Sequence, residues 1–179
     1  MPHCNKQMLS FFLTTKCNLR CVYCYNSKER AKLQEKSLPL EIATAGIDEY
    51  FADNKSRHIR FYGPGEPTQE FELMRQITDY ARQKGGDAVT TELQTNGAFS
   101  PKVREWILEN LNIVWVSFDG MPDIQNKQRP FPNTRDKRKA FLCIYASEKF
   151  DIIFYRELNK EETRVICDMI RPLLPEIKK

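Results

Sequence analysis

Short apolar segments alternate with amphipathic segments along the first two thirds of the chain. Four apolar runs, residues 9–13, 59–62, 88–93 and 113–117, have the length and composition of buried strands. Three segments between them repeat apolar residues at helical spacing, with Pro near the start or Gly at the end; they cover 39–53, 71–85 and 101–111. Strands that alternate with helices predict an α/β protein with a parallel sheet.

A polar motif follows each of the four predicted strands. A cysteine-rich loop comes after the first, and a Gly- and Pro-rich turn at 63–67 comes after the second. Residues 94–97 follow the third strand, and residues 118–120 follow the fourth. Parallel strands bind their ligands at their carboxyl ends, so the sequence predicts that the four motifs meet at one site.

The cysteine-rich loop has the spacing and composition of a metal-binding segment. Cys17, Cys21 and Cys24 lie within eight residues, and soft thiolate ligands suit zinc, copper(I) or an iron–sulfur cluster. A tetrahedral zinc site needs a fourth ligand, yet the next histidine is His58 and the next cysteine is Cys143. A cluster held by three cysteines keeps one iron open for a small chelating molecule.

An ordinary disulfide or small buried side chains fit this loop less well. Asn18, Arg20 and Tyr25 surround the cysteines and make a polar loop rather than a core strand. With Tyr23 as the aromatic residue, the loop reads C-x3-C-x-aromatic-C and resembles the cluster loop of the radical S-adenosylmethionine (radical SAM) enzymes. In that family three cysteines bind a [4Fe–4S] cluster, and the open iron is chelated by the amino and carboxylate groups of S-adenosylmethionine.

This resemblance implies roles for the cysteine loop and a fold for the chain. Cys17, Cys21 and Cys24 become the metal ligands, and Tyr23 lies against the adenine of the cofactor. The implied fold is a partial, shortened (β/α) barrel of radical SAM type with parallel strands.

The second motif, Gly-Pro-Gly-Glu-Pro at 63–67, reads on its own as a tight turn. It resembles the Gly-Gly-Glu-Pro motif of the family, which holds the amino group of the cofactor's methionine. The resemblance implies that Gly63, Gly65 and Glu66 bind the cofactor, although Pro64 departs from the family pattern.

The third and fourth motifs match other parts of the same site. Thr95 and Asn96 resemble the Thr-Asn-Gly segment that lines the pocket, although an Asn-Gly turn would look the same. Ser117, Asp119 and Arg129 resemble the Ser-x-Asp-Gly…Arg-Pro stretch of the peptide- and sulfatase-maturing (SPASM-type) branch. There the serine and the arginine contact the cofactor's carboxylate, and Asp119 becomes the candidate catalytic residue on the substrate side, with loop capping as the alternative.

The alternating pattern stops after residue 129. Segments 141–145 and 151–155 resemble strands, but the connection between them is too short for a parallel crossover, so we expect an antiparallel pair. A last helix is predicted over 160–174. We therefore expect a single radical SAM domain over 1–179, with a matched core at 9–130 and an atypical or truncated C-terminal third. The auxiliary-cluster cysteines of the branch have no counterpart, and exposed apolar surface in this third favours self-association.

Composition adds little to this prediction. Lys and Arg number 28 and Asp and Glu number 24, and the resulting charge of +4 is too weak and dispersed to indicate nucleic-acid binding. The sequence has neither a signal-peptide pattern nor an apolar run of membrane-spanning length. One cysteine cluster with three scattered cysteines is typical of a cytoplasmic metal protein.

The expected function is that of a radical SAM enzyme. The resemblance implies reductive cleavage of S-adenosylmethionine to a 5′-deoxyadenosyl radical, which abstracts hydrogen from a peptide or protein substrate. A reductant such as flavodoxin or ferredoxin is the expected partner. One alternative is a glycyl-radical enzyme activating protein, because Cys24-Tyr25-Asn26 and a short chain also occur there. Another is a non-catalytic iron–sulfur or electron-transfer module.

Overall fold

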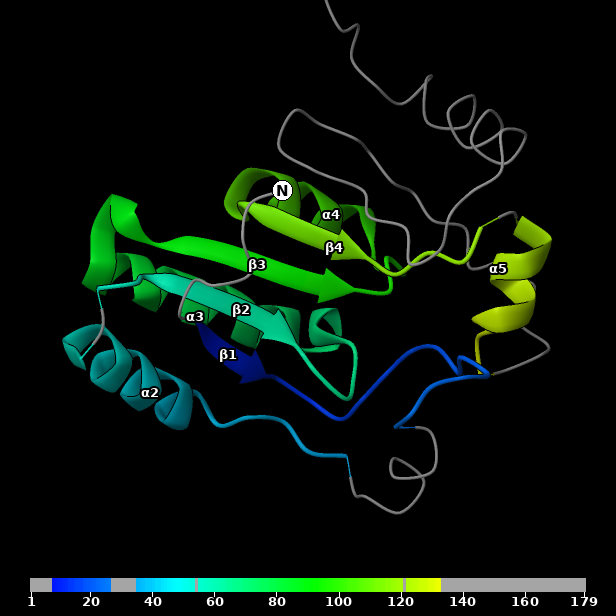
Figure 1. Ribbon diagram of the computed structural model, residues 1–179, viewed down its shortest axis with the longest axis horizontal. Helices are drawn as coiled ribbons and strands as arrows, with labels where there is room; N and C mark the ends of the chain where they lie inside the picture. The colour runs from blue at the N-terminus through cyan, green and yellow to red at the C-terminus, as the bar shows by residue number, and fades with distance from the viewer. Residues whose placement is uncertain (1–7, 27–34, 54, 121, 133–179) are drawn as a thin grey trace, which may run out of the picture.

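A computed structural model describes residues 8–26, 35–53, 55–120 and 122–132 (Figure 1). Four strands form one sheet in the order in which they occur along the chain: β1 (Leu9–Phe12), β2 (His58–Tyr62), β3 (Thr90–Thr95) and β4 (Ile113–Val116). Every neighbouring pair is parallel. The predicted α/β class with a parallel sheet is therefore confirmed.

Three helices connect the strands, as the alternation of patterns predicted. They are α2 (Leu40–Asp53), α3 (Phe71–Gly85) and α4 (Pro101–Asn110). Single 3-10 turns precede and follow α3, at Pro67–Glu70 and Gly86–Ala88. A short helix, α5 (Pro122–Gln128), follows β4. Among the described residues, no helix is long and apolar enough to cross a membrane.

Helices α2, α3 and α4 pack against one face of the sheet, and the core lies between these helices and the strands. Figure 1 shows α3 and α4 behind the strands. The strand residues of this core alternate along each strand, as expected when only one face is covered by helices. The buried side chains that meet there are Phe11, Ile59, Phe61, Leu93 and Val114 from the strands, Leu13 directly after β1, and Ala43, Ile47, Phe51, Met74, Ile77, Ala81, Val103 and Ile107 from the helices.

The opposite face of the sheet carries a polar row. Arg60 on β2 pairs with Glu92 on β3, where Nε and Oε1 are 2.9 Å apart. The Arg60 guanidinium also lies 4.5 Å from the centroid of the Tyr62 ring and donates to Oε1 of Gln94 at 3.1 Å. This row leads toward the carboxyl ends of the strands, where the predicted site lies.

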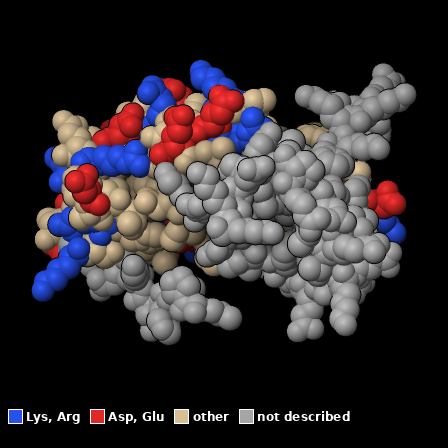
Figure 2. Space-filling view, turned by 90° about the horizontal axis from the view of Figure 1, so that it is seen from above, with Lys and Arg blue, Asp and Glu red and all other residues tan. Residues whose placement is uncertain are grey.

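Charged side chains of both signs are mixed on the surface. On the face drawn in Figure 2, the Lys and Arg side chains of the described residues lie among Asp and Glu side chains. This mixture is in keeping with the weak net charge of +4.

Three details differ from the sequence prediction. The third strand begins at Thr90 rather than Ala88, because α3 ends at Gly85 and a 3-10 turn follows at Gly86–Ala88, where Gly86 has φ 58°. The helical spacing over 39–53 predicts an inward face with Ile42, Gly46, Ile47, Tyr50 and Phe51, but Ile42 is 59% exposed and lies outside the buried face of α2. Helix α5 was not predicted. The predicted elements at 141–145, 151–155 and 160–174 lie outside the described residues.

Candidate functional site

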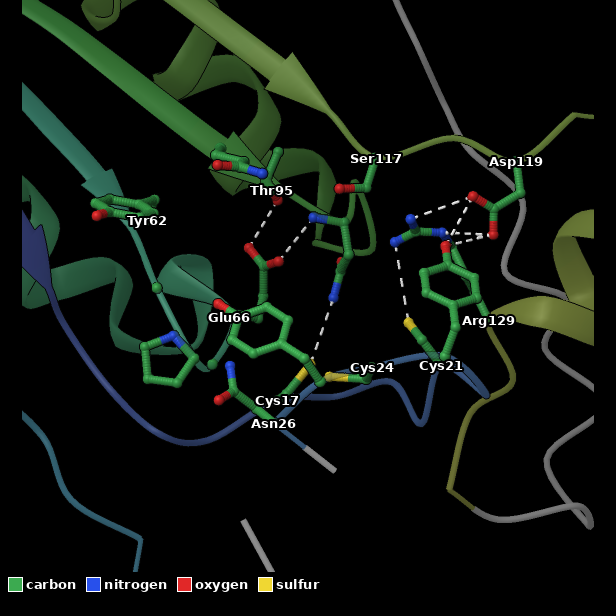
Figure 3. Close-up of a pocket in the computed structure, with 17 residues that line it drawn as sticks. Cys17, Cys21, Cys24, Asn26, Tyr62, Glu66, Thr95, Ser117, Asp119 and Arg129 are labelled. Atoms are coloured by element: carbon green, nitrogen blue, oxygen red, sulfur yellow. Dashed lines mark hydrogen bonds and ion pairs between the residues drawn. The ribbon is translucent and has the colours of Figure 1, made fainter. Parts of the chain in front are cut away.

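The four motifs converge on one cavity of about 550 Å³ at the carboxyl ends of the strands. Figure 3 shows side chains from the cysteine loop, the 63–67 turn, β3 and the segment after β4 around it. All the site residues predicted from the sequence line this cavity: Cys17, Cys21, Tyr23, Cys24, Gly63, Gly65, Glu66, Thr95, Asn96, Ser117, Asp119 and Arg129. The parallel topology thus brings together segments that are up to about a hundred residues apart in the sequence.

The cysteine loop presents three thiols to the cavity. Cys17, Cys21 and Cys24 are half-buried, and none of them forms a disulfide. The three thiols are the candidate ligands of a metal centre by their motif, although the described side chains are not grouped closely enough to enclose a single metal ion as they stand. Burial raises the pKa of the Cys21 thiol above its ordinary value, while the positive charge of Arg129 acts in the opposite direction. A cation beside a thiol favours the thiolate form, which is the form that binds metals.

Helix α5 fixes the outer part of this loop. The backbone N–H of Arg20 donates to the carbonyl of Pro130 at 2.8 Å, and that of Val22 donates to the carbonyl of Gln128 at 2.9 Å. Figure 1 shows the loop and α5 side by side beyond the ends of the strands. As a result, Arg129 at the end of α5 points back at Cys21.

Arg129, Asp119 and Tyr23 form a closed set of contacts. The Arg129 guanidinium donates to both Asp119 oxygens, from Nε at 3.0 Å and from Nη2 at 3.3 Å. The Tyr23 hydroxyl lies 2.7 and 2.6 Å from the same two oxygens, and the guanidinium lies 5.3 Å from the centroid of the Tyr23 ring. Burial and the hydrogen bond to Asp119 raise the pKa of Tyr23, so its hydroxyl stays protonated. The carboxylate of Asp119 is therefore already engaged by two side chains.

Glu66 joins the ends of β2 and β3. This buried carboxylate accepts hydrogen bonds at Oε1 from the Thr68 hydroxyl at 2.8 Å and the Thr95 hydroxyl at 2.6 Å. Its Oε2 accepts from the backbone N–H of Asn96 at 2.7 Å. Burial raises the pKa of Glu66, although all of these donors favour the ionised form.

Gly65 lies where the 63–67 turn touches the start of the cysteine loop. A Cβ at this position would overlap the carbonyl oxygens of Thr14 and Lys16. The next residue, Glu66, donates its backbone N–H to the Lys16 carbonyl at 2.7 Å. Gly63, with φ 136°, has a backbone conformation that favours glycine. Gly65 therefore permits close contact between two parts of the chain itself, a role that its motif, which implies only a ligand contact, does not predict.

Asn96 and Ser117 complete the side of the cavity formed by β3 and β4. The Asn96 amide donates to Oδ1 of Asn18 at 2.8 Å and lies 3.8 Å from the sulfur of Cys17. Ser117 lines the cavity, and its backbone N–H donates to the Thr95 carbonyl at 2.8 Å.

Several contributors to this site had no role assigned from the sequence, although the 94–97 motif included Gln94. Asn18 holds Asn96, and Gln125 accepts the backbone N–H of Asp119 at 2.9 Å. Tyr62 and Gln94 line the cavity from β2 and β3. Tyr62 and Gln94 each follow a buried residue, Phe61 and Leu93, so the alternation along a strand places them on the other face of the sheet. This alternation is the sequence signal that could have identified them as cavity residues.

Comparison with known proteins identifies the family of this chain. The family model of the Radical SAM superfamily matches residues 11–170. The chain is 31% identical over 163 residues to the Fe-coproporphyrin III synthase of Methanosarcina barkeri, an alignment that covers 90% of this chain and 39% of that protein. It is 30% identical over 148 residues to an uncharacterized protein of Methanocaldococcus jannaschii, covering 79% of this chain and 49% of the relative. The chain thus spans less than half the length of these relatives.

Another relative and a solved structure extend the comparison. A putative glycyl-radical enzyme activating enzyme of Methanocaldococcus jannaschii is 33% identical over 103 residues, which cover 58% of this chain and 39% of that protein. The solved structure of native anSMEcpe with bound S-adenosylmethionine superposes with a TM-score of 0.60 at 23% identity, over 70% of this chain and 35% of that one. This second likeness shows a shared fold. By the family match, the chain belongs to the radical SAM superfamily, whose cofactors are a [4Fe–4S] cluster and S-adenosylmethionine.

Proposed function

We propose that the chain carries the cofactor site of a radical SAM enzyme that modifies a peptide or protein. The observation that carries this proposal is the convergence of three cysteines, none of them in a disulfide, with the other motifs on one cavity. When bound, the cluster and S-adenosylmethionine supply one electron and a 5′-deoxyadenosyl radical for hydrogen abstraction. Cys17, Cys21 and Cys24 ligate the cluster in this proposal.

The 63–67 turn and β3 bind the amino group of the cofactor's methionine. Oε2 of Glu66 accepts one hydrogen bond, from Asn96, and a carboxylate oxygen can accept a second from an ammonium group. Gly63 and Gly65 contribute backbone at the same wall of the cavity. Thr95 fixes the Glu66 carboxylate through its hydroxyl.

Ser117 and Arg129 bind the carboxylate of the same methionine, and Tyr23 lies against the adenine. Support for this assignment is that Ser117 and Arg129 lie across the cavity from Glu66 (Figure 3), and that Tyr23 lines the same cavity beside Arg129. We assign Asp119 to positioning rather than acid–base work, because Tyr23 and Arg129 already occupy its oxygens. The Asp119 carboxylate then fixes the direction of the Arg129 guanidinium.

A peptide or protein substrate is favoured by the Ser117, Asp119 and Arg129 motif, which resembles that of the SPASM-type branch. Activation of a glycyl-radical enzyme is the second candidate, favoured by Cys24-Tyr25-Asn26 and by the relative named for that activity. Incubation of the reduced holoenzyme with candidate peptides, and separately with a glycyl-radical enzyme, separates the two. A modified peptide mass supports the first candidate, and a glycyl-radical EPR signal supports the second.

Anaerobic reconstitution with iron and sulfide tests the cofactor site. The wild type is compared with a Cys17→Ala, Cys21→Ala, Cys24→Ala variant and with a matched control in which Cys4, Cys143 and Cys167 are replaced by Ala. We expect iron–sulfur absorption and 5′-deoxyadenosine in the wild type and the control, and neither in the first variant. An electron-transfer module would bind the cluster and release no 5′-deoxyadenosine, and full absorption in the first variant would refute the ligand assignment.

The partners are also part of the proposal. Flavodoxin or ferredoxin supplies the electron, and self-association completes the substrate side of the site. Light scattering of the holoenzyme measures its self-association, and the ratio of 5′-deoxyadenosine to product measures how completely the substrate side of the site is closed. A monomer with a ratio near one would contradict it.

A further inference from the structure

Two of the three cavity thiols receive an N–H group from another part of the chain. The Asn96 side-chain nitrogen, at the end of β3, lies 3.8 Å from the sulfur of Cys17. Nη1 of Arg129, after α5, lies 3.9 Å from the sulfur of Cys21. Figure 3 draws the contact of Arg129 with Cys21, and the contact made at Cys17, as dashed lines.

The Asn96 amide is held in one orientation. Its Oδ1 accepts the backbone N–H of Ala98 at 2.8 Å, so the nitrogen must face the cysteine loop. An amide nitrogen carries two hydrogens. One goes to Oδ1 of Asn18 at 2.8 Å, and the second is directed at Cys17. The backbone N–H of Asn96 is fixed as well, by Glu66.

The Arg129 guanidinium is equally constrained. Its Nε and Nη2 face the Asp119 carboxylate, and its plane lies near the Tyr23 ring. The whole residue is 7% exposed. The two contacts with Asp119 fix the orientation of the guanidinium. In this orientation the remaining nitrogen, Nη1, points toward the sulfur of Cys21.

We propose that Asn96 and Arg129 are positioning residues that raise the reduction potential of the cluster. This inference rests on the proposed ligand role of the cysteines. Reduction transfers one electron from a one-electron reductant to the cluster, without making or breaking a bond, and increases the negative charge on the cluster and its sulfurs. N–H dipoles and a guanidinium charge directed at those sulfurs stabilise the reduced form, because hydrogen bonds to the sulfurs and local charge set such potentials.

An EPR-monitored redox titration of the holoenzyme without S-adenosylmethionine tests this role. We expect Arg129→Gln to lower the equilibrium constant for reduction about tenfold, or about 59 mV for one electron. Asn96→Ser keeps an oxygen acceptor for Ala98 but cannot reach Cys17, and we expect a shift of about threefold in the same direction. Arg20→Gln is the matched control, because this exposed arginine of the same loop donates to the carbonyl oxygens of Cys17 and Leu19 rather than to sulfur. It should keep the wild-type potential.

A measurement on the wild type covers the case in which the variants do not fold. Pulsed EPR of the reduced holoenzyme, with 15N-labelled arginine, should show a nitrogen coupling to the cluster, and exchange into D2O should show exchangeable protons near it. This inference would be overturned if both variants kept the wild-type reduction potential, or if the wild type showed neither the nitrogen coupling nor the exchangeable protons. The cluster and the proposed function would still stand in either case. A wild type that assembles no cluster would instead refute the proposed function.

Discussion

Gly65 packs directly against the carbonyl oxygen of Lys16, one residue before the first cysteine of the loop. The adjacent hydrogen bond, from the backbone N–H of Glu66 to the same carbonyl at 2.7 Å, keeps the two segments in contact. The glycine therefore sets the distance between the 63–67 turn and the cysteine loop.

Gly65→Ala should separate these two segments. The added methyl group meets backbone atoms that cannot rotate away, so we expect the free energy of unfolding to fall by about 1–3 kcal/mol. Iron bound per chain after reconstitution should fall as well. Gly46→Ala is the matched control, because a Cβ at that position on α2 has nothing within 4 Å. Alanine in a helix interior should raise stability by about 0.5–1 kcal/mol. Equal effects of the two substitutions in urea unfolding would contradict this interpretation of Gly65.

Glu66→Gln should destabilise the protein even when no cofactor is present. The amide places an N–H2 group where Thr68, Thr95 or Asn96 now donates, and an unmatched buried donor costs about 1–3 kcal/mol. Urea unfolding of the apoprotein measures this loss. Glu72→Gln, a carboxylate with a 60% exposed side chain on α3, should change stability by less than about 0.5 kcal/mol. If Glu66 served only the cofactor, the apoprotein would keep its stability and only the affinity for S-adenosylmethionine would fall.

The fold was predictable because its signals are local and repeated. Each strand is a short apolar run, and Ser100 with Pro101 marks the start of α4, where the Ser100 hydroxyl accepts the backbone N–H of Val103. The parallel order then followed from the alternation of strands and helices, and it placed the four motifs at one edge. The convergence on one cavity therefore needed no information beyond the sequence.

Contacts between distant residues were not predictable in the same way. Helix α5 is short, and its apolar residues do not recur at helical spacing, so the sequence does not predict it. Its position is fixed by the hydrogen bond of Gln125 and by the backbone hydrogen bonds with the cysteine loop. The pairing of Arg129 with Asp119 depends on that helix, so the sequence alone could not tell this arginine from a surface arginine. Likewise, a glycine beside a ligand and a glycine beside backbone, as at Gly65, look the same in a sequence.

The pair of Glu92 and His58 should make stability depend on pH. Burial alone raises the pKa of Glu92, but the hydrogen bond with His58 and the positive charge of Arg60 outweigh it and lower the pKa below its ordinary value. A lowered pKa means that the unfolded chain binds the proton first as the pH falls. The contribution of Glu92 is therefore complete above its unfolded pKa of about 4.3 and is lost as the pH falls through the folded value.

Glu92→Gln tests this dependence. We expect a loss of about 1–3 kcal/mol at pH 7, because Arg60 is left without its carboxylate. Between about pH 5 and pH 3 the variant should lose less stability than the wild type, since the titrating group is gone. Glu109→Gln, an exposed residue of α4, should stay within about 0.5 kcal/mol of the wild type at pH 7. Parallel pH profiles for the wild type and Glu92→Gln would contradict the assignment.

The contacts among Tyr23, Asp119 and Arg129 should couple the cysteine loop to α5. Asp119→Asn leaves the buried Arg129 guanidinium without a charged partner, which should cost about 3 kcal/mol or more. Tyr23→Phe removes a hydrogen bond to a carboxylate from a residue that is 53% exposed, and we expect a loss of about 0.5–1.5 kcal/mol. Because the Tyr23 hydroxyl acts through Asp119, the double variant should lose less than the sum of the two single losses.

A second tyrosine–aspartate pair provides the control for this cycle. The Tyr80 hydroxyl donates to Asp48 at 2.7 Å on the surface of α2 and α3, where the Asp48 side chain is 48% exposed. Tyr80→Phe should therefore cost less than about 1 kcal/mol. Hydrogen exchange gives the local readout, because the Val22 amide donates to the carbonyl of Gln128. We expect this amide to exchange faster in Asp119→Asn and unchanged in Tyr80→Phe. Additive losses in the cycle, together with unchanged exchange at Val22, would show that α5 and the cysteine loop are held by the backbone contacts alone.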